Sequence, residues 1–199
     1  MDTARYVLAL VSLVGLVPGF LLWFFIHPLA GFWRRLGPVW TYAILGVPVV
    51  ALMASVYLAR DVLLAREYGT RFPLVVLGLL CLVPAGLIAR RRRRQLTFRI
   101  LAGVPELSQD QGTRKLLTEG IYGTIRHPRY VELMFWLLGY ALIANYLALY
   151  VAVVISIPLL WLVVVLEERE LRQRFGSEYE AYARKVPRFV PSRIGQMTH

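Results

Sequence analysis

Residues 130–166 read YVELMFWLLGYALIANYLALYVAVVISIPLLWLVVVL and decide the fold. Two apolar runs, 130–143 and 147–166, flank the short turn Ala144-Asn145-Tyr146. The second run has about the length that crosses the hydrocarbon core of a bilayer as a helix. We therefore expect a helical hairpin within a membrane.

Three more apolar runs precede this hairpin, at 6–26, 40–58 and 73–89, and 58% of the 199 residues are hydrophobic. A soluble domain of this size has too much surface to bury so many apolar side chains. We therefore expect an all-α fold, a polytopic transmembrane bundle of about five spans. Prolines inside the runs predict bends, because membrane helices tolerate them.

We expect one membrane domain over residues 1–199. Its parts are three N-terminal spans (1–89), a polar loop (90–129), the hairpin (130–166), and an amphipathic helix with its tail (167–199). Apolar residues at helical spacing predict that last helix, with an interruption near Gly176. These residues are Leu171, Phe175, Tyr179, Tyr182 and Val186.

The distribution of basic residues predicts the orientation of the chain. Segments 27–39, 90–129 and 167–199 carry 2, 10 and 7 Lys and Arg residues, which is 19 of the 23 in the chain. The positive-inside rule places these segments in the cytoplasm, with the N-terminus outside and the C-terminus inside. The run Arg90-Arg91-Arg92-Arg93-Arg94 is suited to anionic lipid headgroups. Topology thus explains the positive charge, and nucleic-acid binding is not expected.

The segment before the hairpin is the first candidate for chemistry. Two glycines in residues 116–130 allow the backbone to approach a ligand closely, and Pro128 suits the first turn of a helix. His127 is then expected near the helix N-cap, where backbone N–H groups favour an anion. Arg126 and Arg129 add positive charge, although they equally suit the role of interfacial anchors.

Two adjacent carboxylates, Glu167 and Glu168, are the second candidate. They follow the last apolar run, where Arg169 and Arg172 can neutralise them in a solvated helix turn. In a functional role they face a bound cation or accept hydrogen bonds from ligand hydroxyls. Both candidates meet at the foot of one hairpin, so the predicted pocket has an anion-binding end and an acidic end. S-adenosylmethionine carries a carboxylate, a cationic centre and a ribose, and suits such a pocket.

The same residues resemble a known family. The elements Leu117-Thr118-Glu119-Gly120-Ile121-Tyr122, Arg126-His127-Pro128-Arg129-Tyr130, Glu167-Glu168, Phe175-Gly176-Ser177-Glu178-Tyr179 and Val186-Pro187 are similar to the isoprenylcysteine carboxyl methyltransferases. That family is close to the phospholipid methyltransferases. The resemblance covers residues 114–191. It implies an integral membrane methyltransferase that uses S-adenosylmethionine, releases S-adenosylhomocysteine, and admits a lipophilic acceptor from the bilayer.

The resemblance also implies site residues. Tyr122 and Tyr130 would flank the adenosyl group, and His127 would help to hold the methionine carboxylate. Glu168, and Glu132 by its place inside the fourth apolar run, are the candidate catalytic carboxylates. The expected cofactor contacts are Lys115, Leu116, Leu117, Tyr122, His127, Pro128, Arg129, Tyr130 and Glu167.

Three positions differ from the prenylcysteine pattern. Val163 replaces an arginine that engages the substrate carboxylate, Arg114 replaces a frequent histidine, and Glu132 replaces a glycine. The loss of the arginine argues against carboxyl methylation of a prenylcysteine, and Glu132 favours a polar or amine-bearing acceptor. A lipid, an isoprenoid, a quinone-like ring and a small thiol all stay open as acceptors.

Two other functions are compatible with parts of the sequence. A sterol-reductase-like protein that uses NADPH would share a similar R-H-x-x-Y element, but such proteins have more spans, and Tyr122 stands where they tend to have tryptophan. A non-enzymatic protein that binds anionic lipids would use the arginine run alone. The cofactor that raises the melting temperature distinguishes these possibilities.

Overall fold

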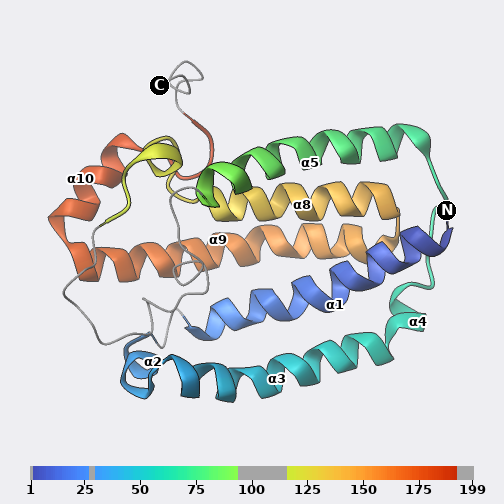
Figure 1. The fold of residues 1–199 in the computed structure, drawn as a ribbon, viewed down its shortest axis with the longest axis horizontal. Helices are drawn as coiled ribbons and strands as arrows, with labels where there is room; N and C mark the ends of the chain where they lie inside the picture. Colours follow the sequence, from blue (N-terminus) through green and yellow to red (C-terminus); the bar gives the residue numbers. More distant parts are fainter. Residues whose placement is uncertain (1, 27–29, 94–115, 192–199) are drawn as a thin grey trace.

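The structure is a computed structural model that describes residues 2–26, 30–93 and 116–191. These residues form an α-helical bundle, which confirms the predicted fold class (Figure 1). In chain order the elements are α1 (Asp2–Ile26), α2 (Ala30–Leu36), α3 (Pro38–Leu58), α4 (Arg60–Leu63), α5 (Phe72–Arg93), the 3-10 helix η1 (Gly120–Gly123), α8 (Pro128–Ala144), α9 (Leu147–Phe175) and α10 (Ser177–Lys185).

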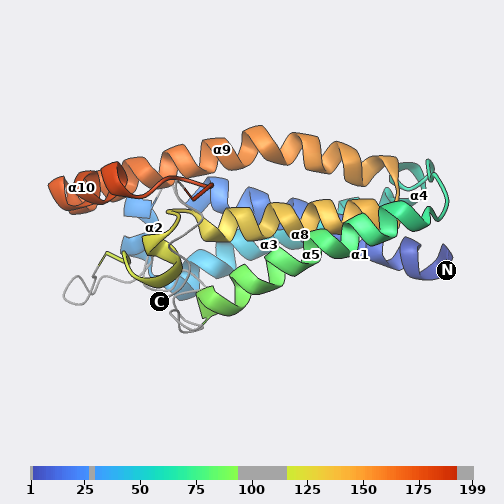
Figure 2. The same ribbon diagram turned by 90° about the horizontal axis from the view of Figure 1, so that it is seen from above.

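The five long helices α1, α3, α5, α8 and α9 correspond to the five predicted apolar runs, and they extend in roughly the same direction (Figures 1 and 2). In the described part of the chain, three of them are long and apolar enough to cross a membrane: α3 from Val39, α5 and α9. Helices α1, α5 and α9 continue through Pro18, Pro84 and Pro158, so these prolines do not end them. Such prolines fit helices that neighbouring helices surround.

Helices α5 and α8 form the closest contact of the bundle, because small residues face each other. A Cβ atom on Gly78 would lie 2.7 Å from the carbonyl oxygen of Gly139, and one on Gly139 would lie 2.5 Å from Cδ2 of Leu82. Small residues that let two backbones approach are typical of helix pairs in membranes. This contact brings the C-terminal end of α5 to the start of α8.

The predicted tight turn between α8 and α9 is confirmed at Asn145, which adopts a left-handed conformation with φ of 58°. Its side-chain nitrogen donates to the carbonyl oxygen of Gly69 at 2.8 Å, and its oxygen accepts from the Tyr150 hydroxyl at 2.8 Å. Asparagine tolerates this backbone conformation better than most residues. The turn directs α9 back along α8, so the start of α8 and the end of α9 meet at the opposite end of the bundle.

Two predicted boundaries were wrong, whereas the interruption expected near Gly176 is confirmed. Helix α9 continues without a break through Leu166 to Phe175, and Gly176, with φ of 51°, then separates it from α10. Residues 90–93 are not part of a loop but form the last turn of α5. Four arginines there complement the negative C-terminal end of the helix dipole. The segment around α2, the end of α5, and α10 lie at one end of the bundle (left in Figure 1), so the basic segments are gathered as expected.

Candidate functional site

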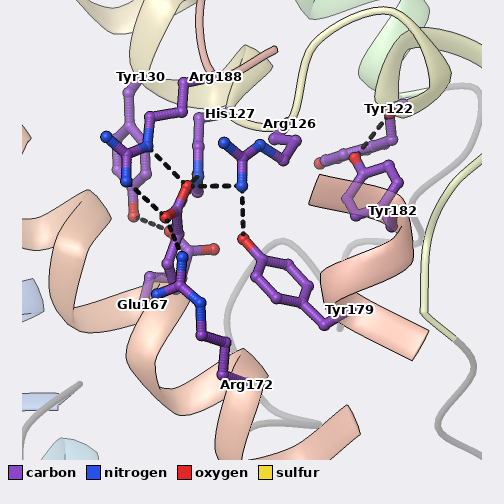
Figure 3. A network of polar contacts seen from close by, with 10 residues as sticks. Tyr122, Arg126, His127, Tyr130, Glu167, Arg172, Tyr179, Tyr182 and Arg188 are labelled. Carbon is purple, nitrogen blue, oxygen red and sulfur yellow. Dashed lines mark hydrogen bonds and ion pairs between the residues drawn. The ribbon is translucent and has the colours of Figure 1, made fainter. Parts of the chain in front are cut away.

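The candidate site lies where α8 begins, and five segments form it, namely η1, the start of α8, α9, α10 and the chain after α10. The backbone N–H of Arg126 donates to the carbonyl oxygen of Pro187 at 2.9 Å, and that of His127 donates to the carbonyl oxygen of Arg188 at 3.1 Å. These bonds hold the chain after α10 against the start of α8, close to the end of α9 (Figure 3). His127 is the N-cap residue of α8 and Pro128 is its first residue, as predicted.

Glu168 is the centre of the polar network, and its side chain is fully buried. Arg188 donates to it twice, from Nε to Oε1 at 3.0 Å and from Nη2 to Oε2 at 2.8 Å. Arg172 donates to Oε2 at 3.2 Å, and Arg126 Nη1 lies 3.0 Å from Oε1. Burying a carboxylate is costly unless it is paired and hydrogen-bonded. Three guanidinium groups meet this requirement, so Glu168 connects α9 to the start of α8 and to the chain after α10.

His127 places its ring between the two carboxylates. Its Nε2 lies 3.2 Å from Glu168 Oε1, and its Nδ1 lies 3.6 Å from Glu167 Oε2. Burial lowers the pKa of His127, but hydrogen bonds to Glu167 and Glu168 outweigh this effect and hold the pKa above its usual 6.5. Both ring nitrogens therefore face carboxylates of the protein, and the ring acts as a bridge across the glutamate pair.

Glu167 differs from its neighbour because 28% of its side chain is exposed. The Tyr130 hydroxyl donates to Glu167 Oε2 at 2.8 Å, and this bond orients the carboxylate (Figure 3). Within the pair, Glu168 is enclosed and Glu167 still reaches open space. A ligand can therefore contact Glu167 directly, whereas Glu168 acts through its partners.

Helix α10 supplies two tyrosines to the site. Tyr179, which is almost fully buried, accepts a hydrogen bond from Arg126 Nη1 at 3.4 Å. Tyr182 donates to the backbone carbonyl oxygen of Tyr122 at 2.6 Å and so holds η1 in place. Burial raises the pKa of Tyr122 to about 12, so this phenol is protonated at neutral pH. The tyrosines connect η1, α10 and the start of α8 in one unit.

Glu132 lies outside this network and pairs with Arg92 of α5. Arg92 Nε donates to Oε2 at 2.9 Å and Nη2 donates to Oε1 at 3.2 Å, with each residue about nine-tenths buried. Arginine and carboxylate groups match in such a two-point arrangement. Glu132 is thus neutralised between two helices. The whole run from Arg90 to Arg94 was expected to face headgroups, and this expectation was wrong for Arg92, which points inward.

The remaining predicted cofactor contacts differ in how deeply they are buried. Pro128 and Leu116 are buried, Arg129 is half-buried, and Leu117 is 41% exposed. Lys115 and Arg114 lie outside the described residues. The structure therefore brings Tyr130, His127, Glu167 and Glu168 into direct contact, and it places η1 with Tyr122 against them through α10.

Sequence reasoning missed Arg188, the partner that binds both oxygens of Glu168. Val186-Pro187 was part of the family resemblance, but a single arginine after it carries no signal of a partner 20 residues earlier. Arg188 also lies over the Trp161 ring, 4.9 Å from its centroid, and Phe189 lies between the rings of His127 and Trp161. The chain after α10 thus covers one side of the site.

Comparisons with known proteins agree with the earlier resemblance. The protein-S-isoprenylcysteine O-methyltransferase of Schizosaccharomyces pombe is 36% identical over 80 residues, which are 38% of this chain and 33% of that protein. Protein-S-isoprenylcysteine O-methyltransferase B of Arabidopsis thaliana is 35% identical over 78 residues, 39% of this chain and 40% of that protein. The chain thus matches less than half the length of these curated relatives. No solved structure matches it significantly.

The profile of one protein family matches residues 74–178, more than half of the chain, and is described as phospholipid methyltransferase. The matched region begins in α5 and ends in the first turn of α10, so it contains η1, α8 and both glutamates of α9. The apolar helices and this match together identify a multi-pass membrane protein. The chain belongs to the phospholipid methyltransferase family.

Proposed function

We propose that this protein transfers a methyl group from S-adenosylmethionine to a lipophilic acceptor that enters from the bilayer. The observation that carries the proposal is the glutamate pair of α9, in which the enclosed Glu168 binds the surrounding guanidinium groups and the partly exposed Glu167 is accessible to a ligand. This arrangement lies within the region that matches the methyltransferase family.

The residues of the site fit S-adenosylmethionine in charge and in hydrogen bonding. Arg126 Nε is buried and has no hydrogen-bond partner among the described residues, so it can donate to the methionine carboxylate. Glu167 can accept from the ribose hydroxyls or face the cationic groups, and Tyr122 and Tyr130 supply aromatic surface. Leu116, Leu117, Pro128 and Arg129, with Lys115, complete the proposed set of contacts.

The bound donor would supply an already activated methyl group, so the protein needs no strong acid or base. Its tasks are to align the reacting groups and to exclude water. We assign Glu167 and Tyr130 to direct contact and Glu168 and His127 to positioning. We assign Glu132 a positioning role too, because Arg92 occupies both of its oxygens.

The acceptor is proposed to be lipophilic, since the site lies at the end of apolar helices. The named relatives act on S-isoprenylcysteine proteins. Here Val163 is 1% exposed and packs with Tyr130, Leu160 and Val164, so no cation stands at the position where the prenylcysteine pattern has arginine. We therefore favour an acceptor that is not a free carboxylate, with an amine, thiol or hydroxyl as the methylated group.

We propose that the site faces the cytoplasm, with the N-terminus outside. The basic segments lie at the same end of the bundle as the site, and the positive-inside rule places that end in the cytoplasm. S-adenosylmethionine is a cytoplasmic metabolite, so this orientation gives the site access to the donor. The arginines at the end of α5 would then contact anionic headgroups.

The decisive experiment uses purified protein, methyl-labelled S-adenosylmethionine and a total lipid extract. We expect the label in a lipid-soluble product, whose identification gives the acceptor. Glu167→Gln should reduce labelling strongly, and Arg169→Gln, two residues further along and exposed, should not. Melting temperatures give a second reading, because a ligand at about 100 times its Kd stabilises a protein by about 2.7 kcal/mol. Stabilisation by NADPH alone would instead support a reductase, and no effect of either ligand would support a lipid-binding protein.

A further inference from the structure

The arginine run at the end of α5 is divided between two faces of the helix. Arg92 points inward to Glu132 of α8, as its bidentate contact shows. Arg90 and Arg93 are exposed, and both line a cavity together with Gly86. Residues 86, 90 and 93 are spaced by four and three, so they share one helix face. The run is therefore not uniform, since one arginine stabilises the bundle and two border a cavity.

The cavity is a groove between α5 and α8 with a volume of about 440 Å³. This volume is within the range of small-molecule sites. Gly86 and Ala89 form a floor without bulky side chains, and Trp136 of α8 forms the wall. A Cβ atom built on Gly86 would meet nothing within 4 Å, so the space above this residue is empty. The groove thus has an apolar part that suits a hydrocarbon chain.

The basic end of the groove carries two positive charges that no described residue neutralises. No described residue accepts a hydrogen bond from Arg90 or Arg93 or forms an ion pair with them, whereas Arg92 donates to both oxygens of Glu132. Guanidinium groups bind phosphate through charge-assisted hydrogen bonds. Two of them, one turn apart beside an apolar floor at the end of a membrane helix, match a phosphodiester with an attached acyl chain.

We propose that this groove binds one anionic phospholipid, with its phosphate at Arg90 and Arg93 and one acyl chain along Gly86, Ala89 and Trp136. The proposal rests on the headgroup binding proposed above for the arginines of α5, and it specifies one bound lipid and its position. It differs from a diffuse attraction between surfaces, because it requires both the two arginines and the empty space above Gly86. None of the residues that line the groove belongs to the glutamate network, so the proposal assigns the groove an occupant other than the methyl acceptor.

The test is native mass spectrometry of the full chain in detergent with added phosphatidylglycerol or phosphatidylcholine. We expect one phosphatidylglycerol to bind in preference to phosphatidylcholine. Glycerol phosphate, which has the headgroup chemistry without acyl chains, should not compete at equal concentration. Arg90→Gln with Arg93→Gln should lower the affinity about thirtyfold, because each basic residue near a lipid surface contributes about 1 kcal/mol.

Two further variants separate the groove from general charge. Gly86→Leu fills the groove without changing the charge and should lower the affinity equally. Arg169→Gln with Arg184→Gln removes the same charge from two exposed residues outside the groove, and should leave the affinity unchanged. The melting temperature of each variant shows whether it is folded.

Three results would overturn the proposal. If both double variants lose affinity equally and Gly86→Leu does not, only diffuse headgroup attraction remains. If the unaltered protein shows no preference for phosphatidylglycerol, headgroup binding fails as well. If Gly86→Leu abolishes methyl transfer while phosphatidylglycerol binding persists, the groove belongs to the acceptor.

Discussion

Arg188 binds both carboxylate oxygens of Glu168, at 3.0 and 2.8 Å, across 20 residues of sequence. One partner is on α9 and the other follows α10, so the pair closes the C-terminal part of the chain onto the start of α8. Glu168 is fully buried and Arg188 is partly exposed. The two residues therefore contribute unequally to stability.

Glu168→Ala is expected to destabilise the protein by about 3–5 kcal/mol, because it leaves the guanidinium groups around it without their counter-charge. Arg188→Ala is expected to cost less, about 1–3 kcal/mol, since Arg126, Arg172 and His127 still bind the carboxylate. Thermal unfolding in detergent measures both. Equal losses would contradict the central position of Glu168, and Arg169→Ala, on the adjacent exposed residue, is the control.

The stability of the protein is expected to fall as the pH rises through the folded-state pKa of His127. This pKa lies above 6.5, so the contribution of the protonated ring is complete below pH 6.5 and is lost at higher pH. The measurement is the difference in melting temperature between the unaltered protein and His127→Gln, from pH 6 to pH 9. The difference should shrink with rising pH. A difference that grows with pH would show that the neutral ring is the stabilising form.

Much of this arrangement was predictable from local sequence. The apolar runs marked the five long helices, and Asn145 in a short polar turn marked the hairpin. His127 before Pro128 marked the helix start, because each residue type suits its position. Such features depend only on residues that are close together in the sequence, so they can be recognised from one sequence alone.

The missed features depend on distant partners. Five consecutive arginines have no periodicity, so nothing in their pattern shows that Arg92 points inward. The end of α9 was misplaced because the change from apolar to charged residues marks the membrane boundary, whereas the backbone hydrogen bonds continue beyond it. Arg188 could be recognised only once α10 had folded back on the site.

The contact between α5 and α8 leads to a packing prediction. Gly78→Ala is expected to destabilise the protein by about 1–3 kcal/mol, since the added Cβ would lie 2.7 Å from a backbone oxygen that cannot easily move. Gly46→Ala in α3 is the matched control. Its Cβ would meet nothing within 4 Å, and alanine favours a helix over glycine by about 0.5–1 kcal/mol. Opposite shifts in melting temperature are therefore expected, and equal shifts would contradict the close contact.

Variants of Glu132 show whether this residue only holds α5 and α8 together or also takes part in catalysis. Because Arg92 occupies both of its oxygens, Glu132→Gln is expected to lower stability while the folded enzyme keeps its rate of methyl transfer. A double-mutant cycle with Arg92→Gln should give a coupling energy of about 0.5–3 kcal/mol, as is found for residues in contact. Turnover per folded molecule, measured against pH, distinguishes the roles. If Glu132→Gln removed turnover and an associated pKa from the profile without changing stability, Glu132 would be the general base, and its pairing with Arg92 would have to open during the reaction.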